Sequence, residues 1–117
     1  MEKILIISCA KIRDTSCVAC LKCFKASEAK DGEFARYDAP KINAMCGCGD
    51  CPGLVMPKIG LVMEMVDYMD RDIDAIHFGT CMVKANQTAA CPINLEELAK
   101  KLSGKFGKPV VMGTHNY

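Results

Sequence analysis

The residues with the greatest chemical potential in this sequence are its nine cysteines. Cys48 and Cys51 form a C-x2-C pair in a glycine-rich stretch, a spacing at which two sulfurs can bind one metal ion. Pro52 is the expected first residue of a helix, so Cys51 would stand at a helix N-terminus, where free N–H groups stabilise a thiolate. That environment serves metal ligation and redox attack equally well. Cys46 adds a third sulfur just upstream.

A second group of cysteines has the pattern C-x2-C-x2-C and consists of Cys17, Cys20 and Cys23. It is similar to the start of the bacterial ferredoxin motif, in which a fourth cysteine follows after three further residues. Ser27 stands at that position here, and Cys91, which precedes a proline, is a candidate for the missing thiolate. The group predicts a cofactor-binding segment, although Cys23, in mid-helix, fits a buried core position equally well.

The composition narrows the chemistry that these thiols can carry. An odd number of cysteines cannot all pair within one chain, and the first apolar stretch is too short for a secretory signal. We therefore expect a cytoplasmic protein with reduced thiols, which select zinc, copper(I) or iron–sulfur clusters. The net charge of +1 and the lack of a long apolar run indicate neither nucleic acid nor membrane as a partner. The expected partners are a metal ion or cluster and, for a redox role, a redox partner protein.

The hydrophobic pattern predicts strands that alternate with helices over the 117 residues, which we interpret as one domain, 1–117. The expected strands are 3–8, 42–45, 74–79 and 109–112. The second strand is expected to be short because of Pro40. The expected helices are 17–30, 54–70 and 94–102, the last with Asn94 as its N-cap and 104–107 as its end. This order predicts a three-layer α/β fold with a four-stranded parallel sheet, flanking helices and the flavodoxin-like strand order 2-1-3-4.

The predicted fold gathers soft ligands at one edge of the sheet. In an open parallel sheet, ligands bind beyond the carboxyl ends of the strands. The first and third predicted strands end at a cysteine, three cysteines follow the second, and a histidine follows the fourth. The predicted metal ligands are Cys9, Cys46, Cys48, Cys51, Cys81, Cys91 and His115. His77 alternates with its neighbours inside a predicted strand, so we expect a packed histidine there.

An ordered set of short motifs runs the length of the chain. It consists of Cys9, residues 19–22 with Phe24 behind them, 32–34, 48–53, Cys81, Cys91 with Pro92, and 113–115. In this order the motifs resemble the CGGC-domain family, which is found mainly in anaerobic bacteria and archaea. The resemblance implies a metal-binding domain, with zinc suggested by its cysteines and histidine, and implies no particular activity. This sequence departs from the signature at Asp50, which replaces the second glycine.

Three functions stay open at this point. The first is a metal-binding protein with a thiolate-rich zinc or iron–sulfur centre. The second is an iron–sulfur protein for electron transfer or cluster handling. The third is a thiol–disulfide redox enzyme in which Cys51 attacks and Cys48 resolves. The residues support zinc and iron–sulfur about equally and indicate no substrate, so catalysis is left open.

Overall fold

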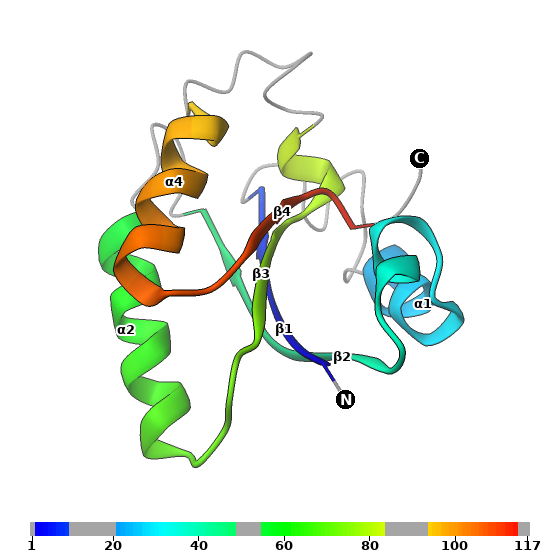
Figure 1. Cartoon of the computed structure of the whole chain (residues 1–117), viewed down its shortest axis with the longest axis horizontal. Helices are drawn as coiled ribbons and strands as arrows, with labels where there is room; N and C mark the ends of the chain where they lie inside the picture. The colour runs from blue at the N-terminus through cyan, green and yellow to red at the C-terminus, as the bar shows by residue number, and fades with distance from the viewer. Residues whose placement is uncertain (1, 10–20, 49–54, 84–93, 115–117) are drawn as a thin grey trace.

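The fold is built on a four-stranded parallel sheet with helices on both of its faces (Figure 1). The computed structural model describes residues 2–9, 21–48, 55–83 and 94–114. The strands are β1 (Glu2–Ser8), β2 (Pro40–Gly47), β3 (Ala75–Phe78) and β4 (Val110–Met112). They lie in the order β2-β1-β3-β4, which confirms the predicted α/β fold and its 2-1-3-4 strand order.

Strand β1 is the centre of the sheet. It pairs with β2 on one side and with β3 on the other, and Ile7 lies opposite both Cys46 and Phe78. The run from Ile4 to Ile7 is fully buried. A continuous apolar run is what a strand needs when helices cover both faces of its sheet.

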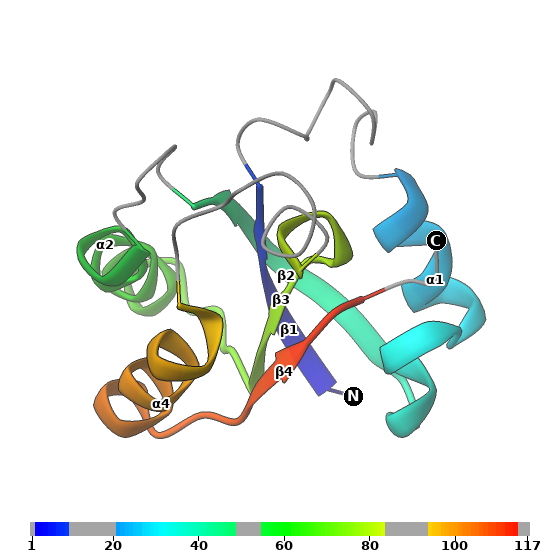
Figure 2. The ribbon, with the colours of Figure 1, turned by 90° about the horizontal axis from the view of Figure 1, so that it is seen from above.

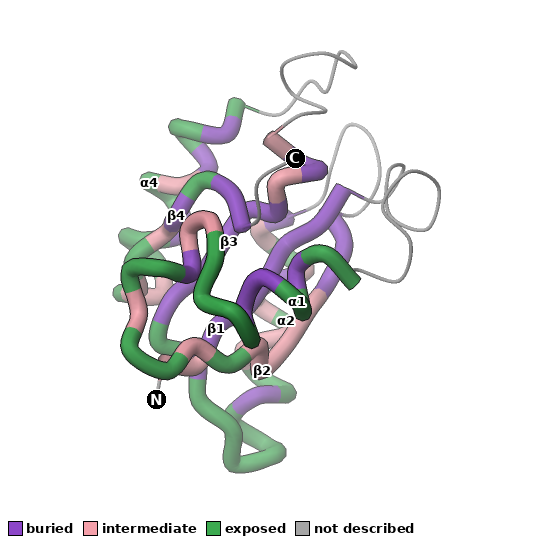
Figure 3. The backbone as a smooth tube through the Cα atoms, turned by 90° about the vertical axis from the view of Figure 1, so that its right-hand side faces the viewer, coloured by how far each residue is buried: buried purple, intermediate pink, exposed green. Residues whose placement is uncertain are grey.

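The helices divide between the two faces. Helices α2 (Val55–Tyr68) and α4 (Leu95–Phe106) lie on one side of the sheet, here termed the α2/α4 face (Figure 2). Helix α1 (Leu21–Ala29) and the short 3-10 helix η2 (Gly32–Arg36) lie on the other, the α1 face. Each face has its own apolar core, and Figure 3 shows that buried residues run along β1 and β3.

Helix α4 shows how local chemistry fixes an element's ends. The Asn94 side-chain oxygen accepts a hydrogen bond from the Glu97 amide at 3.1 Å, which confirms the predicted N-cap. The helix continues past the predicted 94–102 and through Gly104 to Phe106, so it is longer than predicted, and it ends within the predicted segment 104–107. A solvent-exposed glycine is tolerated inside a helix, and the end comes at Gly107, which adopts the left-handed conformation with φ +67°.

Strand β2 is longer than predicted because Pro40 does not shorten it. Pro40 is the first residue of an edge strand, where its missing N–H breaks no ladder. The strand also contains a bulge: Ile4 pairs with Ile42 and Leu5 pairs with Ala44, so Asn43 is an extra residue.

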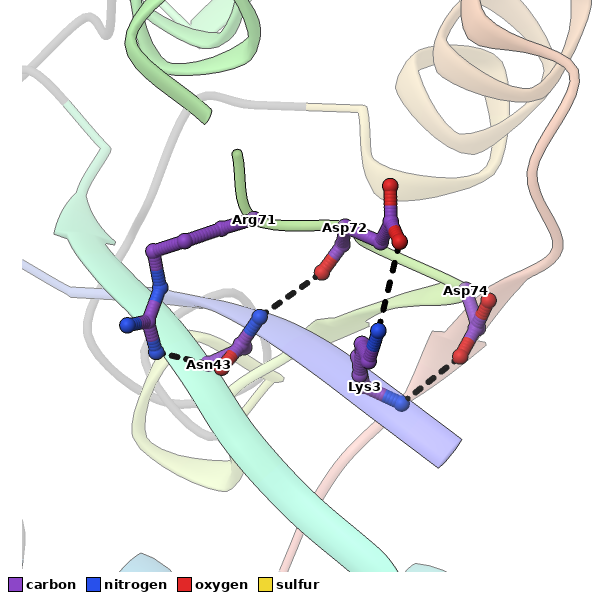
Figure 4. Close-up of polar contacts among 5 residues, drawn as sticks. All are labelled: Lys3, Asn43, Arg71, Asp72 and Asp74. Atoms are coloured by element: carbon purple, nitrogen blue, oxygen red, sulfur yellow. Dashed lines mark hydrogen bonds and ion pairs between the residues drawn. The ribbon is translucent and has the colours of Figure 1, made fainter. Parts of the chain in front are cut away.

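Polar contacts fix this bulge at the end of the sheet opposite the cysteines (Figure 4). The Asn43 amide donates to the Asp72 carbonyl at 2.8 Å, and Arg71 donates to the Asn43 side-chain oxygen. The backbone N–H of Lys3 donates to the Asp74 carboxylate at 2.9 Å, and the Lys3 ammonium pairs with Asp72 at 3.2 Å. The loop from α2 to β3 is thereby tied to β1 and β2.

Candidate metal site

Four described cysteines lie at the carboxyl ends of the first three strands. All four are buried and belong to the apolar core of the α2/α4 face. We term them the strand-end thiols: Cys9, Cys46, Cys48 and Cys81. Four sulfurs in an otherwise apolar cluster form a soft donor set, which fits zinc or iron–sulfur iron and not magnesium or calcium.

The pairing of β1 with β2 places Cys9 beside Cys48. Ser8 lies opposite Gly47, and the ladder continues one step further because the Cys48 N–H donates to the Ser8 carbonyl at 2.9 Å. The Ser8 hydroxyl also donates to the Cys46 carbonyl at 3.2 Å. Residues at the same register of neighbouring strands lie side by side, so these contacts bring Cys9 and Cys48 to adjacent positions.

Cys81 reaches the end of β1 from the turn that follows β3. The Gly79 N–H donates to the Ile7 carbonyl at 2.7 Å, and residues 80–83 are helical. The backbone N–H of Cys9 donates to the Cys81 sulfur across 3.2 Å. Hydrogen bonds of this kind tune the sulfurs of metal-bound thiolates.

Gly79 makes room for that sulfur. A Cβ atom at this position would lie 3.3 Å from the Cys81 Sγ and 3.3 Å from the Ile7 carbonyl oxygen, both of them crowded contacts. The absence of a side chain therefore lets Cys81 lie against the end of β1.

The described residues do not complete a metal site by themselves. Within residues 2–9, 21–48, 55–83 and 94–114, no group of three or more His, Cys, Asp or Glu side chains could hold an ion. The other predicted ligands and cofactor-binding residues lie outside this part of the chain: Cys17, Cys20, Cys51, Cys91 and His115.

Cys23 lies on the opposite side of the sheet from the strand-end thiols. It is a buried residue of α1 and belongs to the apolar core of the α1 face. Its sulfur is 3.2 Å from the Thr114 hydroxyl oxygen. Cys23 and the strand-end thiols therefore belong to different apolar cores, and a cofactor-binding role for Cys23 stays a prediction.

Comparison with known proteins agrees with the motif order. The sequence model of the CGGC domain matches residues 3–115. This chain belongs to the CGGC-domain family. It is also 35% identical to the uncharacterized protein MJ0582 of Methanocaldococcus jannaschii, in an alignment that covers 97% of this chain and 86% of the relative. No solved structure matches the chain. Among its described residues, this CGGC domain has no helix of the length and apolar character needed to cross a membrane.

A buried polar cluster of the CGGC domain could not be predicted from its sequence. His77 is fully buried and stacks on Phe34 at 5.2 Å between ring centroids, as expected of a packed histidine. Its Nδ1 lies 2.8 Å from the Gly113 carbonyl oxygen, and its Nε2 lies 2.7 Å from the Tyr37 hydroxyl. A carbonyl only accepts, so Nδ1 carries the hydrogen and Nε2 accepts from Tyr37. Burial lowers the pKa of His77, against the opposing effect of the Gly113 hydrogen bond.

Proposed function

We propose that this CGGC domain is a metal-binding protein that holds a thiolate-rich zinc or iron–sulfur centre at the carboxyl edge of its parallel sheet. The observation that carries the proposal is that Cys9, Cys48 and Cys81 all lie just beyond the carboxyl ends of neighbouring strands. They follow β1, β2 and β3, and the Cys9 amide donates to the Cys81 sulfur at 3.2 Å. Scattered core cysteines would have no reason to follow three neighbouring strands at the edge where parallel sheets bind their ligands.

The proposed ligands come partly from the residues that the structure describes and partly from the rest of the chain. The strand-end thiols supply sulfur from one side, and Cys51, Cys91 and His115 are the candidates that complete the set. A structural zinc site closes with four such ligands, and iron–sulfur clusters are also held by four thiolates. The predicted cofactor-binding residues Cys17, Cys20 and Cys23 would serve a second centre or enlarge the first.

Anaerobic purification of the whole chain, followed by elemental analysis and a visible spectrum, tests the proposal. Stoichiometric zinc in a colourless protein would support a zinc centre. Iron with acid-labile sulfide and broad visible absorption would support a cluster and make electron transfer or cluster handling the leading role. A metal-free protein that reduces a disulfide substrate would contradict the proposal and favour a redox enzyme that uses Cys48 and Cys51.

Cysteine substitutions test where the metal is bound. The double variant Cys9→Ser with Cys48→Ser is expected to retain less than about a tenth of the wild-type metal, because two of four soft ligands are lost. Ser27→Ala is the control, since it changes a buried polar side chain of α1 that is outside the predicted ligand set. Unchanged metal content in the double variant would contradict the proposal. A partial loss in the further variant Cys23→Ser would indicate that the group of Cys17, Cys20 and Cys23 binds metal as well, in a second centre or in an enlarged first one.

A further inference from the structure

The turn after β4 is fixed by two hydrogen bonds that join the backbone groups of Gly113 to β3. The Gly113 N–H donates to the Phe78 carbonyl at 2.7 Å, and the Gly113 carbonyl accepts from His77 Nδ1 at 2.8 Å. Gly113 has φ +99°, a conformation that favours glycine. The chain therefore leaves β4 in a direction that β3 determines.

Thr114 continues the same pattern. Its N–H donates to the Thr80 hydroxyl at 2.9 Å, and its carbonyl accepts from the Glu33 N–H at 2.9 Å. Thr114 is fully buried. With both backbone polar groups bonded to different elements, its side chain is held in one place.

The Thr114 hydroxyl contacts both Cys23 and Thr80, the residue that precedes Cys81. Its oxygen accepts from the Thr80 N–H at 3.2 Å, lies 3.3 Å from the Thr80 hydroxyl, and lies 3.2 Å from the Cys23 sulfur. A hydroxyl has one hydrogen and two lone pairs, so these three contacts use all of its hydrogen-bonding capacity.

Thr80 links Thr114 to the turn that carries Cys81. Its amide and its hydroxyl both bond to Thr114, and the next residue is Cys81, whose sulfur accepts from the Cys9 amide. A shift of Thr114 would therefore move the turn that carries Cys81 and would change the contact with the Cys23 sulfur at the same time.

We propose that Thr114 is a positioning residue, whose hydroxyl fixes the Cys23 sulfur on one face and the Cys81 turn on the other and so sets the geometry of the metal centre. The inference rests on the proposed function. Residues that orient metal ligands from outside the ligand set typically change metal affinity by about 10- to 100-fold when they are replaced.

Cobalt titration of the reduced, metal-free whole chain tests this role, with thiolate-to-cobalt charge-transfer absorption as the readout. Thr114→Val removes the hydroxyl and keeps the side-chain shape, and we expect Co²⁺ affinity to fall by about 10-fold. Thr114→Ser restores the hydroxyl and is expected to restore wild-type affinity and spectrum. Ser27→Ala is the control, because it removes another buried hydroxyl of the α1 face, one that bonds to the Phe24 carbonyl at 2.8 Å.

The outcomes separate the two proposals. A wild-type chain that shows neither the charge-transfer band with Co²⁺ nor iron–sulfur absorption after anaerobic purification overturns the proposed function and this inference with it. A wild-type chain that binds Co²⁺ while Thr114→Val binds it equally well overturns only the role of Thr114, as does an equal loss in Ser27→Ala. If Thr114→Val does not fold, Thr80→Val replaces it, since it removes the other hydroxyl of the pair and is expected to weaken Co²⁺ binding in the same direction.

Discussion

The two faces of the sheet bring cysteines to the same edge in different surroundings. On the α2/α4 face, the strand-end thiols lie in a cluster with Ile59, Phe78 and Leu102. On the α1 face, Cys23 contacts the Thr114 hydroxyl, and a buried histidine with its tyrosine partner lies nearby in the same layer. One face is held by apolar packing and the other by packing together with directional hydrogen bonds.

This difference shows how one small sheet can hold ligands of two kinds. A thiol behaves as a small hydrophobic group, so several thiols can be buried together in an apolar core. A buried hydroxyl or imidazole must be hydrogen-bonded, so each such group fixes the position of its partner. Packing on the α2/α4 face should therefore contribute most to the free energy of unfolding. Each hydrogen bond of the α1 face should contribute less.

The largest expected effect comes from opening the apolar face. Ile59 is fully buried in α2, so Ile59→Ala should lower the free energy of unfolding by about 2–5 kcal/mol. Urea unfolding of the reduced, metal-free chain measures the change. Leu61→Ala is the control, because Leu61 belongs to the same helix but is 68% exposed and should cost less than about 0.5 kcal/mol. Similar losses in the two variants would show that α2 does not pack on the sheet through Ile59.

A smaller effect is expected on the α1 face. Tyr37→Phe removes the hydroxyl that donates to His77 Nε2 at 2.7 Å and leaves a buried acceptor without that donor. The free energy of unfolding should fall by about 1 kcal/mol, the lower end of the usual range, because Tyr37 is only half-buried and water can reach the site. Tyr68→Phe, at a position that is 83% exposed, should leave stability unchanged. If Tyr37→Phe also leaves the free energy of unfolding unchanged, the hydrogen bond between Tyr37 and His77 does not stabilise the fold.

Local patterns in the sequence predict the apolar face well. The strand order, the N-cap at Asn94 and the arrival of cysteines at three strand ends all follow from periodicity and from the rules for parallel sheets. The errors concern the start of β2 and the end of α4. Whether Pro40 can begin a strand depends on its being at an edge, and which residue of 104–107 ends α4 depends on where the left-handed residue falls. Neither condition is a property of the local sequence.

The α1 face could not be predicted in the same way. Tyr37 and His77 are separated by 40 residues, and Cys23 and Thr114 by 91 residues, so no spacing rule connects them. Their contacts depend on η2 and on the turn after β4, which hydrogen bonds to distant strands hold in place. A threonine that follows a glycine carries no local signal of such a role.

The smallest expected effect is a pH dependence confined to the α1 face. Because burial lowers the pKa of His77, the folded chain binds fewer protons near pH 6.5 than the unfolded chain does. The contribution of neutral His77 is therefore present above the unfolded-state pKa of about 6.5 and is lost as the pH falls through it toward the lower folded-state pKa. Protonated His77 would still donate to the Gly113 carbonyl, so the loss comes from burying the charge.

Urea unfolding of the metal-free chain at two pH values measures this term. Between about pH 7.5 and about pH 6, one histidine of unfolded pKa about 6.5 can account for at most about 0.8 kcal/mol. His77→Phe should remove that part of the pH slope, even though it lowers stability at both pH values. His115→Gln, which changes the other histidine of the sequence, should retain it. If the slope persists in His77→Phe, other groups cause it, and the α1 face holds His77 equally well in either charge state.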